Sequence, residues 1–373
     1  MKIGITCYPT FGGSGVVATE LGHELARRGH DVHFITYAMP SRLNVFADRV
    51  TYHEVTVPSY PLFQYAPYDL ALATRMGDVA THEKLDLIHV HYALPHAISA
   101  HLAREMLAPV RLGLVTTLHG TDVTIVGQDR SYLPITRFGI EKSDAVTAVS
   151  EHLKQVTIDV FQPKKDIVVI PNFIDPVRFS PESPQLSCRF VPAGRRVLMH
   201  VSNFRPVKRV LDVVEVFDRV QKRVPASLVM VGDGPDRPAA EALCREKGLA
   251  GHVTFLGNMP AVEALMPSAD LYLLPTDSES FGLSALEAQA CGVPVLGYAV
   301  GGLPEVVVSG ETGFLRAVGD VAGLADDGAA LLLDDARYKA ISQTARARAV
   351  KLFNADAIVS RYLALYERVL AAA

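Results

Sequence analysis

The chain has 373 residues, 49% of them hydrophobic, and a formal net charge of −4 at pH 7. This length exceeds what one hydrophobic core usually serves and fits two domains of ordinary size. The small negative charge, with acidic and basic residues interspersed, excludes nucleic acid as a partner, so any polyanion bound by the chain is small.

Short β-rich apolar runs alternate with helical patterns along the whole chain, which predicts βα units and parallel sheets. In the first half the predicted strands are residues 3–8, 32–36, 85–91, 112–118 and 145–149. Between the first two strands, apolar residues recur at helical spacing up to Gly29, which supplies a C-terminal stop. The chain therefore opens with a strand, a glycine loop, a helix and a second strand.

The segment 170–185 is rich in Pro, Asn and Asp and is predicted to connect two domains. A new βα series begins at Val197, with further strands predicted at 227–231, 253–256, 271–274 and 293–296. Helical patterns follow at 337–350 and 355–370. Two Rossmann-like halves are the simplest division of such a chain.

The cysteines are widely spaced and form no C-x-x-C pair, which predicts reduced thiols rather than a disulfide or zinc framework. They are Cys7, Cys188, Cys244 and Cys291, of which Cys7 and Cys291 are expected to fill the core. The N-terminus lacks the apolar run and cleavage site of a signal peptide, and the uncharged stretch 288–304 is too short for a membrane span. We expect a soluble, cytoplasmic protein without stable membrane insertion.

The most informative run is Glu279-Ser-Phe-Gly-Leu-Ser-Ala-Leu-Glu287, followed by C-G-V-P-V and then Gly301-Gly302-Leu-Pro-Glu305. Two carboxylates eight positions apart straddle a turn and the start of a helix. Both can reach one polyhydroxylated ligand at that helix N-terminus, where unpaired N–H groups favour a phosphate. Two glutamates at this spacing also occur by chance on solvated helices, but the S-F-G, C-G-x-P-V and G-G-x-P-E strings favour a binding site.

This run resembles the E-x7-E signature of the family-four retaining GT-B glycosyltransferases, which move a sugar from a nucleotide diphosphate. The resemblance implies an α/β fold of two Rossmann-like domains whose parallel sheets face a central cleft. It implies an acceptor-binding domain of residues 1–168 plus 353–373 and a nucleotide-sugar-binding domain of residues 169–352. The last helix then crosses back to the first domain, which periodicity alone cannot show.

Arg205 and Lys208 follow the first strand of the second domain, at the strand end where open α/β sheets bind ligands. A forked guanidinium and a compact ammonium in one short turn suit a diphosphate, although an exposed basic loop that binds nothing is the alternative. In the family the matching pair grips the nucleotide diphosphate, so both are expected to be catalytic and donor-binding. Arg209 is expected to be structural or solvated.

Gly12-Gly13-Ser14-Gly15 opens the first helix, where glycines let a backbone approach phosphate or substrate closely. A Rossmann dehydrogenase also has a glycine loop here, but its G-x-G-x-x-G fingerprint is missing. We expect Gly13 on the donor side and Ser14 on the acceptor side. The turn Val231-Gly-Asp-Gly-Pro235 either lies near the nucleotide, as the resemblance implies, or is a plain turn.

His119 lies where an apolar strand meets a glycine turn. It is either a core histidine with satisfied hydrogen bonds or, as in the family, a catalytic-site residue near the 6-hydroxyl of the sugar. His89 and His91 share one face of a strand and superficially resemble metal ligands. No third ligand with suitable spacing is evident, so we expect no metal and no cofactor.

The strings CYPTFGGSGVVATELG, HVHYALPHA, TTLHGTDVTIVGQD, RFGIEKSDAVTAVS and SNFRPVKR narrow the resemblance to the family members of bacillithiol biosynthesis. These join UDP-GlcNAc and L-malate into GlcNAc-malate plus UDP and keep the α configuration. By resemblance, Glu287 holds the ribose hydroxyls, and the catalytic Glu279 binds the transferred sugar together with the backbone of Phe281 and Gly282. Malate would attack from the face that UDP leaves, with a phosphate oxygen taking its proton.

Malate carries two carboxylates, so its pocket needs hydrogen-bond donors and positive potential. The acceptor-binding candidates are Ser14, Tyr92, Thr117 and Asn203, which lie at strand ends or in the glycine loop. Tyr92 could equally pack against Pro95, and Thr117 could only satisfy a backbone group. Arg205 is a further candidate to touch malate.

Other functions remain open from the sequence alone. The same donor could serve inositol phosphate or a lipid-linked sugar, and a UDP-GlcNAc 2-epimerase or a non-catalytic nucleotide-sugar binder shares the architecture. A two-step reaction with Glu279 as nucleophile, as in retaining glycosidases, is also conceivable. The oligomeric state is left open, a homo-oligomer included.

Overall fold

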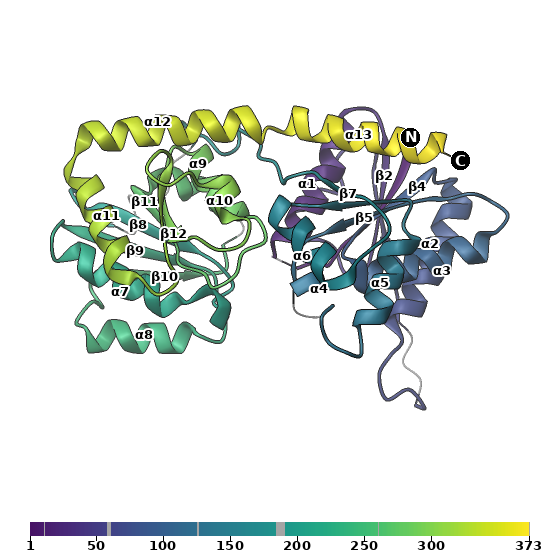
Figure 1. Cartoon of the computed structure of the whole chain (residues 1–373), viewed down its shortest axis with the longest axis horizontal. Helices are drawn as coiled ribbons and strands as arrows, with labels where there is room; N and C mark the ends of the chain where they lie inside the picture. Colours follow the sequence, from purple (N-terminus) through teal and green to yellow (C-terminus); the bar gives the residue numbers. More distant parts are fainter. Residues whose placement is uncertain (11, 58–60, 125–126, 184–190, 260, 373) are drawn as a thin grey trace. The chain divides into compact units, whose positions relative to one another are not determined.

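The computed structural model describes residues 1–10, 12–57, 61–124, 127–183, 191–259 and 261–372 (Figure 1). It consists of two compact units, one of Met1–Asn172 with Ala355–Ala373 and one of Phe173–Asn354. Each unit is a parallel sheet with helices packed on it, which confirms the two Rossmann-like domains. The predicted connection ends at 184–185, and these two residues and Cys188 lie outside the described residues.

The first unit has a seven-stranded sheet in the order β3-β2-β1-β4-β5-β6-β7. Its strands are β1 (Lys2–Thr6), β2 (Asp31–Thr36), β3 (Val50–Glu54), β4 (Leu87–His91), β5 (Gly113–Leu118), β6 (Ala145–Ala148) and β7 (Ile167–Val169). The sequence did not predict β3 and β7. Both are edge strands, one with mostly exposed or half-exposed side chains and one only three residues long, so neither has a clear apolar run.

Helices cover both faces of this sheet. They are α1 (Gly13–Arg27), α2 (Tyr68–Glu83), the π-helix η1 (Ala93–Ala97), α3 (Ile98–Leu107), α4 (Thr121–Thr124), α5 (Leu133–Lys142), α6 (Glu151–Phe161) and α13 (Ala355–Ala371). Helix α1 packs on the face of Phe34, because a Cβ on its Gly22 would lie 2.4 Å from that ring. Helices α2 and α3 pack on the opposite face, with Ile35, Ile88 and Leu114.

The final helix α13 belongs to the first unit. It contacts α1 and β5, and its side chains Tyr362 and Tyr366 are buried. Arg28 at the end of α1 forms an ion pair with Asp356 in the first turn of α13. The C-terminal segment therefore completes the core of the domain in which the chain begins.

The second unit has a six-stranded sheet in the order β10-β9-β8-β11-β12-β13. Its strands are β8 (Arg196–Val201), β9 (Ala226–Val231), β10 (Val253–Gly257), β11 (Leu271–Leu274), β12 (Val295–Tyr298) and β13 (Gly313–Arg316). Its helices are α7 (Val210–Gln221), α8 (Arg237–Glu246), α9 (Leu283–Ala290), α10 (Leu303–Val306), α11 (Val321–Leu333) and α12 (Asp335–Leu352), with short 3₁₀ turns η3 (Pro206–Lys208), η4 (Val262–Ala264) and η5 (Met266–Ser268). The four-residue edge strand β13 was not predicted.

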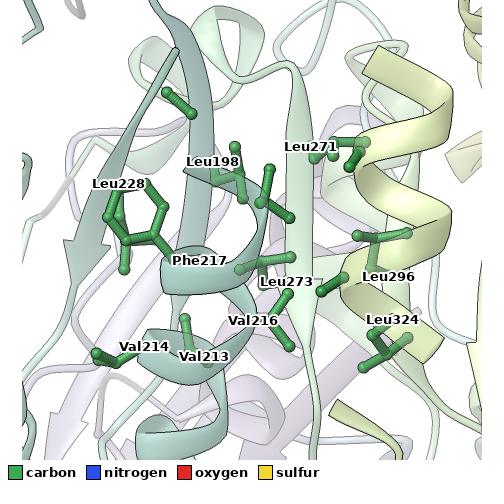
Figure 2. Close-up of a cluster of buried hydrophobic side chains, with 14 of the residues drawn as sticks. Leu198, Val213, Val214, Val216, Phe217, Leu228, Leu271, Leu273, Leu296 and Leu324 are labelled. Atoms are coloured by element: carbon green, nitrogen blue, oxygen red, sulfur yellow. The ribbon is translucent and has the colours of Figure 1, made fainter. Parts of the chain in front are cut away.

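A buried apolar cluster joins α7 and α11 to one face of this sheet. Figure 2 shows Phe217 of α7 beside Leu228 of β9 and Leu198 of β8, and Leu324 of α11 near Leu296 of β12. Burial of a large apolar side chain contributes about 1.5–3 kcal/mol, so this cluster holds the strands in register. The carboxyl ends of β8, β9, β11 and β12 then present their loops at one edge of the sheet.

Three cysteines, Cys7, Cys244 and Cys291, are free and buried. Cys7 and Cys291 fill the core as predicted, and burial raises the pKa of both thiols to about 12. Among the described residues, no helix has the length and apolar character needed to cross a membrane.

Candidate functional site

The carboxyl edge of the second sheet carries the predicted cations. Strand β8 ends at Val201, and the chain turns through η3 before α7 begins. Arg205 precedes η3 and is exposed, whereas Lys208 at its end is half-buried. The backbone N–H of Lys208 donates to the carbonyl of Arg205 at 2.8 Å, so both cations stand on one closed turn.

Lys208 meets one of the two predicted carboxylates. Its Nζ donates to Oε2 of Glu279 at 2.8 Å, and the two side chains are 22% and 17% exposed. Residues 71 positions apart in the sequence are thus in direct contact. An ammonium and a carboxylate at one accessible edge provide both a ligand for phosphate oxygens and an acceptor for sugar hydroxyls.

The backbone of Glu279 is clamped by the Gly-Gly pair that follows β12. Gly301 has a φ of +56°, and a Cβ there would lie 1.9 Å from the carbonyl oxygen of Glu279. The N–H of Gly302 donates to the same carbonyl at 2.8 Å. Only glycine permits this approach, which explains why the Gly-Gly string accompanies the two glutamates.

The loop between β8 and α7, which carries both cations and is called the cation loop below, is joined to the loop of Glu279 by hydrogen bonds to Val207. Its carbonyl accepts hydrogen bonds from Oγ1 of Thr276 at 2.8 Å and from the N–H of Asp277 at 2.9 Å. Thr276 is fully buried, so its side chain belongs to the packed base of this loop. This role of Thr276 was not predicted, because a single threonine after a strand has no distinctive pattern.

A buried histidine supports the start of the same loop. Nδ1 of His200 is bonded to the carbonyl of Leu273 at 2.8 Å, and Nε2 is bonded to the hydroxyl of Ser202 at 2.7 Å. That hydroxyl accepts from the N–H of Phe204 at 3.2 Å. Burial lowers the pKa of His200 to about 4, so the imidazole is neutral at pH 7. This supporting role of His200 was not predicted.

The Gly-Asp-Gly turn after β9 packs against the cation loop. A Cβ on Gly232, whose φ is +116°, would lie 1.7 Å from the carbonyl oxygen of Ser202, and one on Gly234 would lie 2.0 Å from that of Asn203. The N–H of Asp236 donates to the carbonyl of Phe204 at 3.0 Å. The turn therefore braces the loop, and its contact with a nucleotide stays a prediction.

The remaining predicted donor residues of the second unit surround the first turns of α9. Gly282 caps the helix with a φ of +98°, and a Cβ built on it would lie 3.8 Å from Cγ of Glu279. Phe281 is buried, with its ring edge-to-face on Phe353 at 5.6 Å. Glu287 is 6% exposed and lies close enough to Tyr272 to raise the pKa of that hydroxyl, which burial raises most. The structure thus brings Lys208, Glu279, Phe281, Gly282 and Glu287 to one edge of the second unit.

Arg209 has the structural role expected of it. Its guanidinium bonds to Asp212 at 2.7 Å and to Asp277 at 3.1 Å. These carboxylates raise its pKa further above the ordinary arginine value, with the Asp212 hydrogen bond as the largest cause. The hydroxyl of Tyr298 also donates to Asp212 at 2.7 Å, so Arg209 is part of a hydrogen-bonded group that stabilises the fold.

In the first unit, His119 lies half-buried at the end of β5. Its Nε2 shares a hydrogen bond with Nδ1 of His91 at 2.8 Å, and their rings stack at 5.0 Å. Burial lowers the pKa of His119 to about 3, so the ring is neutral at pH 7. A neutral imidazole of this kind can accept from or donate to a sugar hydroxyl.

Asp122, which sequence reasoning missed, shapes the turn around His119. Its buried carboxylate accepts from the N–H groups of Ala93 at 3.0 Å, His119 at 3.2 Å and Gly120 at 2.9 Å. Burial raises its pKa, and the backbone hydrogen bonds oppose that rise. An aspartate three residues after a histidine in H-G-T-D was the available signal, since aspartate commonly binds nearby backbone N–H groups.

Tyr92 is half-buried at the end of β4 with a φ of +91°, a conformation that tyrosine rarely adopts. Its ring packs edge-to-face on Tyr8 at 5.2 Å and lies 5.6 Å from the ring of His119. Gly13 and Ser14 begin α1, and the N-cap residue Gly12 offers no side chain to the first N–H groups of the helix. Asn203, the fourth acceptor candidate, is exposed in the cation loop of the second unit.

Thr117 requires a correction, because the structure buries it completely. Its hydroxyl lies 2.7 Å from Nε2 of His89 and 2.7 Å from the hydroxyl of Thr147. Nδ1 of His89 is bonded to the hydroxyl of Tyr366 at 2.7 Å. Thr117 therefore links the sheet to α13 and does not face an acceptor, and both ring nitrogens of His89 have protein partners.

Comparisons with known protein families and proteins agree with the resemblance to glycosyltransferases. The model of Glycosyltransferase Family 4 matches residues 11–178, and that of Glycosyl transferases group 1 matches residues 189–348. N-acetyl-alpha-D-glucosaminyl L-malate synthase of Bacillus anthracis is 49% identical over 372 residues, or 99% of this chain and 97% of that protein. The chain belongs to the glycosyltransferase family of this synthase.

Other members of this glycosyltransferase family are more distant. D-inositol 3-phosphate glycosyltransferase of Mycobacterium avium (strain 104) is 30% identical and covers 96% of this chain and 89% of its own length. Among solved structures, Anabaena Alr3699/HepE in complex with UDP-glucose has a TM-score of 0.82 at 22% identity, with both chains fully covered. Sucrose-phosphate synthase from Thermosynechococcus elongatus has a TM-score of 0.81 at 23% identity over the full length of both chains. These two structures share the GT-B fold of the family.

Proposed function

We propose that this chain transfers GlcNAc from UDP-GlcNAc to the hydroxyl of L-malate, with retention of the α configuration, as the first step of bacillithiol biosynthesis. The 49% identity to a malate synthase supports this donor and this acceptor. The observation that carries the proposal is the pair of Lys208 and Glu279 at 2.8 Å beside the N-terminus of α9. It supplies a cation for a diphosphate and a carboxylate for a sugar at one place.

The two cations act on the leaving group. At an effective dielectric of about 20, one pair of unit charges ~4 Å apart is worth roughly 4 kcal/mol before desolvation. Negative charge on UDP grows as the glycosidic bond breaks, so Arg205 and Lys208 stabilise the transition state more than the bound substrate. Glu279 and the backbone at Phe281 and Gly282 hold the sugar, and Glu287 holds the ribose.

The transfer is a single exchange at C1 of the sugar. The malate hydroxyl oxygen forms a bond to C1 on the face from which UDP departs, and the bond from C1 to the phosphate oxygen breaks with its electron pair on UDP. The hydroxyl proton passes to a phosphate oxygen. No carboxylate of the enzyme becomes glycosylated, and His119, neutral at pH 7, binds a hydroxyl of the sugar.

Substrate contacts on the first unit follow from α1. The first N–H groups of a helix favour anions, and Gly12 leaves those of α1 without a side-chain cap. We assign a donor phosphate to Gly13 and a malate carboxylate to Ser14. Tyr92 is the further acceptor candidate of the first unit and Asn203 that of the second, while Thr117 is left out because it is buried.

The reaction proposed here uses no metal, because two protein cations serve the diphosphate. Both substrates are small, charged metabolites, and we place the reaction in the cytoplasm. The 30% identity to D-inositol 3-phosphate glycosyltransferase makes inositol phosphate the second acceptor to test.

The test offers the purified chain UDP-GlcNAc with L-malate, with inositol 3-phosphate or with no acceptor, each with and without EDTA. Expected results are UDP release and a GlcNAc-malate mass in the malate reactions only, unchanged by EDTA. UDP release that follows inositol phosphate would move the substrate assignment to that acceptor. UDP-ManNAc without malate would indicate an epimerase, and binding of UDP-GlcNAc without turnover in any arm would indicate a binding protein.

A further inference from the structure

Two imidazoles and a carboxylate meet at the edge of the first sheet, away from the proposed donor and acceptor residues. His33 lies on β2, His53 lies on the edge strand β3, and Glu83 is the last residue of α2. In the register of β2 and β3, His53 is opposite Ile35, so it shares a sheet face with His33. This is the face that α2 covers, which brings Glu83 to the two rings.

The distances among the three side chains suit a bound ion. Nδ1 of His33 and Nε2 of His53 are 3.0 Å apart, and one ligand atom from each of the three residues lies within 4.8 Å of the others. Zinc bonds to nitrogen and oxygen are about 2.0–2.2 Å long, so ligand atoms of a tetrahedral site are roughly 3.3 Å apart. The nitrogen pair, at 3.0 Å, and the other separations, at most 4.8 Å, lie near that spacing.

The Glu83 carboxylate makes no hydrogen bond or ion pair within the described part of the chain. The backbone carbonyl of Glu83, by contrast, accepts a hydrogen bond from Nζ of Lys2 at 2.8 Å. The carboxylate is close enough to influence both histidines but does not bond to either. A cation between the three side chains gives the carboxylate the partner that it lacks.

Burial and nearby charges act on both histidines. Burial lowers the pKa of both rings, and the positive charge of Lys2 lowers that of His33 while Arg75 lowers that of His53. Glu83 acts in the opposite direction on both, and Asp31 does so on His33. The net effect on both rings is a lowered pKa.

We propose that His33, His53 and Glu83 bind a divalent transition-metal ion, zinc above all, with a solvent molecule as a further ligand. Two nitrogens and one carboxylate oxygen are a ligand set that zinc commonly accepts. His33 is almost fully buried, whereas His53 and Glu83 are half-buried, so an ion reaches the site from the solvent side.

The site lies apart from the transfer chemistry. The carbonyl of Glu83 is bonded to Lys2, the first residue of β1, which places it at the amino edge of the sheet. Tyr92 and His119 follow the carboxyl ends of β4 and β5. A bound ion therefore ties the edge strand β3 to β2 and α2 and stabilises the first unit without entering the reaction.

The experiment measures zinc binding by the full chain, freed of any purification tag and stripped with EDTA. Isothermal titration with Zn²⁺ gives stoichiometry and affinity, and Co²⁺ replaces zinc to report ligation by visible absorption. His53→Asn and Glu83→Gln each remove one ligand. His82→Asn is the matched control, because His82 is exposed beside Glu83 on α2 and its ring bonds to the carbonyl of Asp78.

We expect the wild type and His82→Asn to bind one tight equivalent that His53→Asn and Glu83→Gln lose, with affinity reduced at least about 100-fold. Zinc should raise the unfolding temperature of the first two proteins only. Folding of each variant is checked by circular dichroism. Equal zinc affinity and stoichiometry in all four proteins, or no zinc bound by the wild type, would overturn the proposal and leave a hydrogen-bonded histidine pair. GlcNAc transfer by the stripped wild type reports separately on the proposed function.

Discussion

Lys208→Ala removes the ammonium group that is proposed to face the leaving diphosphate. In the structure this group is 2.8 Å from Glu279, and the two side chains are 22% and 17% exposed. Because of this ion pair, the positive charge of Lys208 is already balanced by Glu279 before a nucleotide binds. UDP must therefore compete with Glu279 for it, so the lysine contributes less to ground-state affinity than an isolated cation would.

The expected effects of Lys208→Ala on UDP affinity and on kcat differ in size. At 2.8 Å and an effective dielectric of about 20, the Coulomb energy of the pair is roughly 6 kcal/mol before desolvation, and partial exposure reduces its net contribution to stability to about 1–2 kcal/mol. Loss of one preorganised group that stabilises transition-state charge costs about 2.7–4 kcal/mol. We expect kcat to fall about 100- to 1000-fold, while UDP affinity weakens less than about tenfold.

The assay is steady-state UDP release with saturating L-malate, together with UDP binding measured by calorimetry. Lys222→Ala is the matched control, because Lys222 also forms a 2.8 Å ion pair, with Asp218, but lies at the far end of α7. Glu279→Gln is the complementary variant. It frees Lys208, so UDP should bind more tightly even though turnover falls.

A kcat for Lys208→Ala within about threefold of the wild type would refute the role of this lysine in leaving-group departure. A loss of UDP affinity as large as the loss of kcat would refute the argument from the ion pair, because it would mean that Lys208 acts equally on bound substrate and transition state.

Three further changes test other parts of the structure. Gly301→Ala places a Cβ where the carbonyl of Glu279 lies 1.9 Å away, so kcat/KM should fall at least about tenfold while circular dichroism reports an intact fold. Thr117→Val removes a buried hydroxyl that is hydrogen-bonded to His89, so it should lower the free energy of unfolding by about 1–3 kcal/mol. The KM for L-malate should stay within about twofold of the wild-type value. A large rise in that KM without loss of stability would restore Thr117 to the acceptor site. Burial lowers the pKa of His89 to about 3, whereas the pKa in the unfolded chain is about 6.5. Above about pH 6.5 the ring is neutral in both states and stability is not reduced. As pH falls below about 6.5, only the unfolded chain takes up the proton, so the free energy of unfolding decreases by up to about 1.4 kcal/mol per pH unit. His89→Asn should therefore flatten the pH dependence of urea unfolding between pH 6.5 and 4, and an unchanged slope would contradict the neutral state assigned to this ring.

Most of the fold was predictable because its central strands are continuous apolar runs. The strands that were missed, β3, β7 and β13, all lie at sheet edges and have three to five residues each. An edge strand buries fewer side chains, so its sequence keeps less of the apolar pattern that identifies a strand. Helix α13 was predicted as a helix from its own periodicity, but its return to the first domain was inferred only by resemblance, and its contacts with β5 and α1 were not predicted.

The chemistry-bearing residues of the candidate site were easier to identify than the residues that position them. Arg205, Lys208 and Glu279 stand in strings with glycine and proline, which single them out. His200 and Thr276 were missed because each acts on a backbone group and has no distinctive neighbours. The bond from His200 joins residues 73 apart, and that from Thr276 joins residues 69 apart, so neither follows from local spacing.

The glycines explain why several separate strings occur together in one chain. Gly301 lies against the backbone of Glu279, and Gly232 lies against the backbone of Ser202, each closer than any Cβ permits. The loops of the donor site are therefore held backbone to backbone, and the reactive side chains project from a frame that does not depend on them. It follows that Lys208→Ala should change the chemistry and leave the frame intact, whereas a substitution at Gly301 should displace Glu279 even though every reactive group is still present.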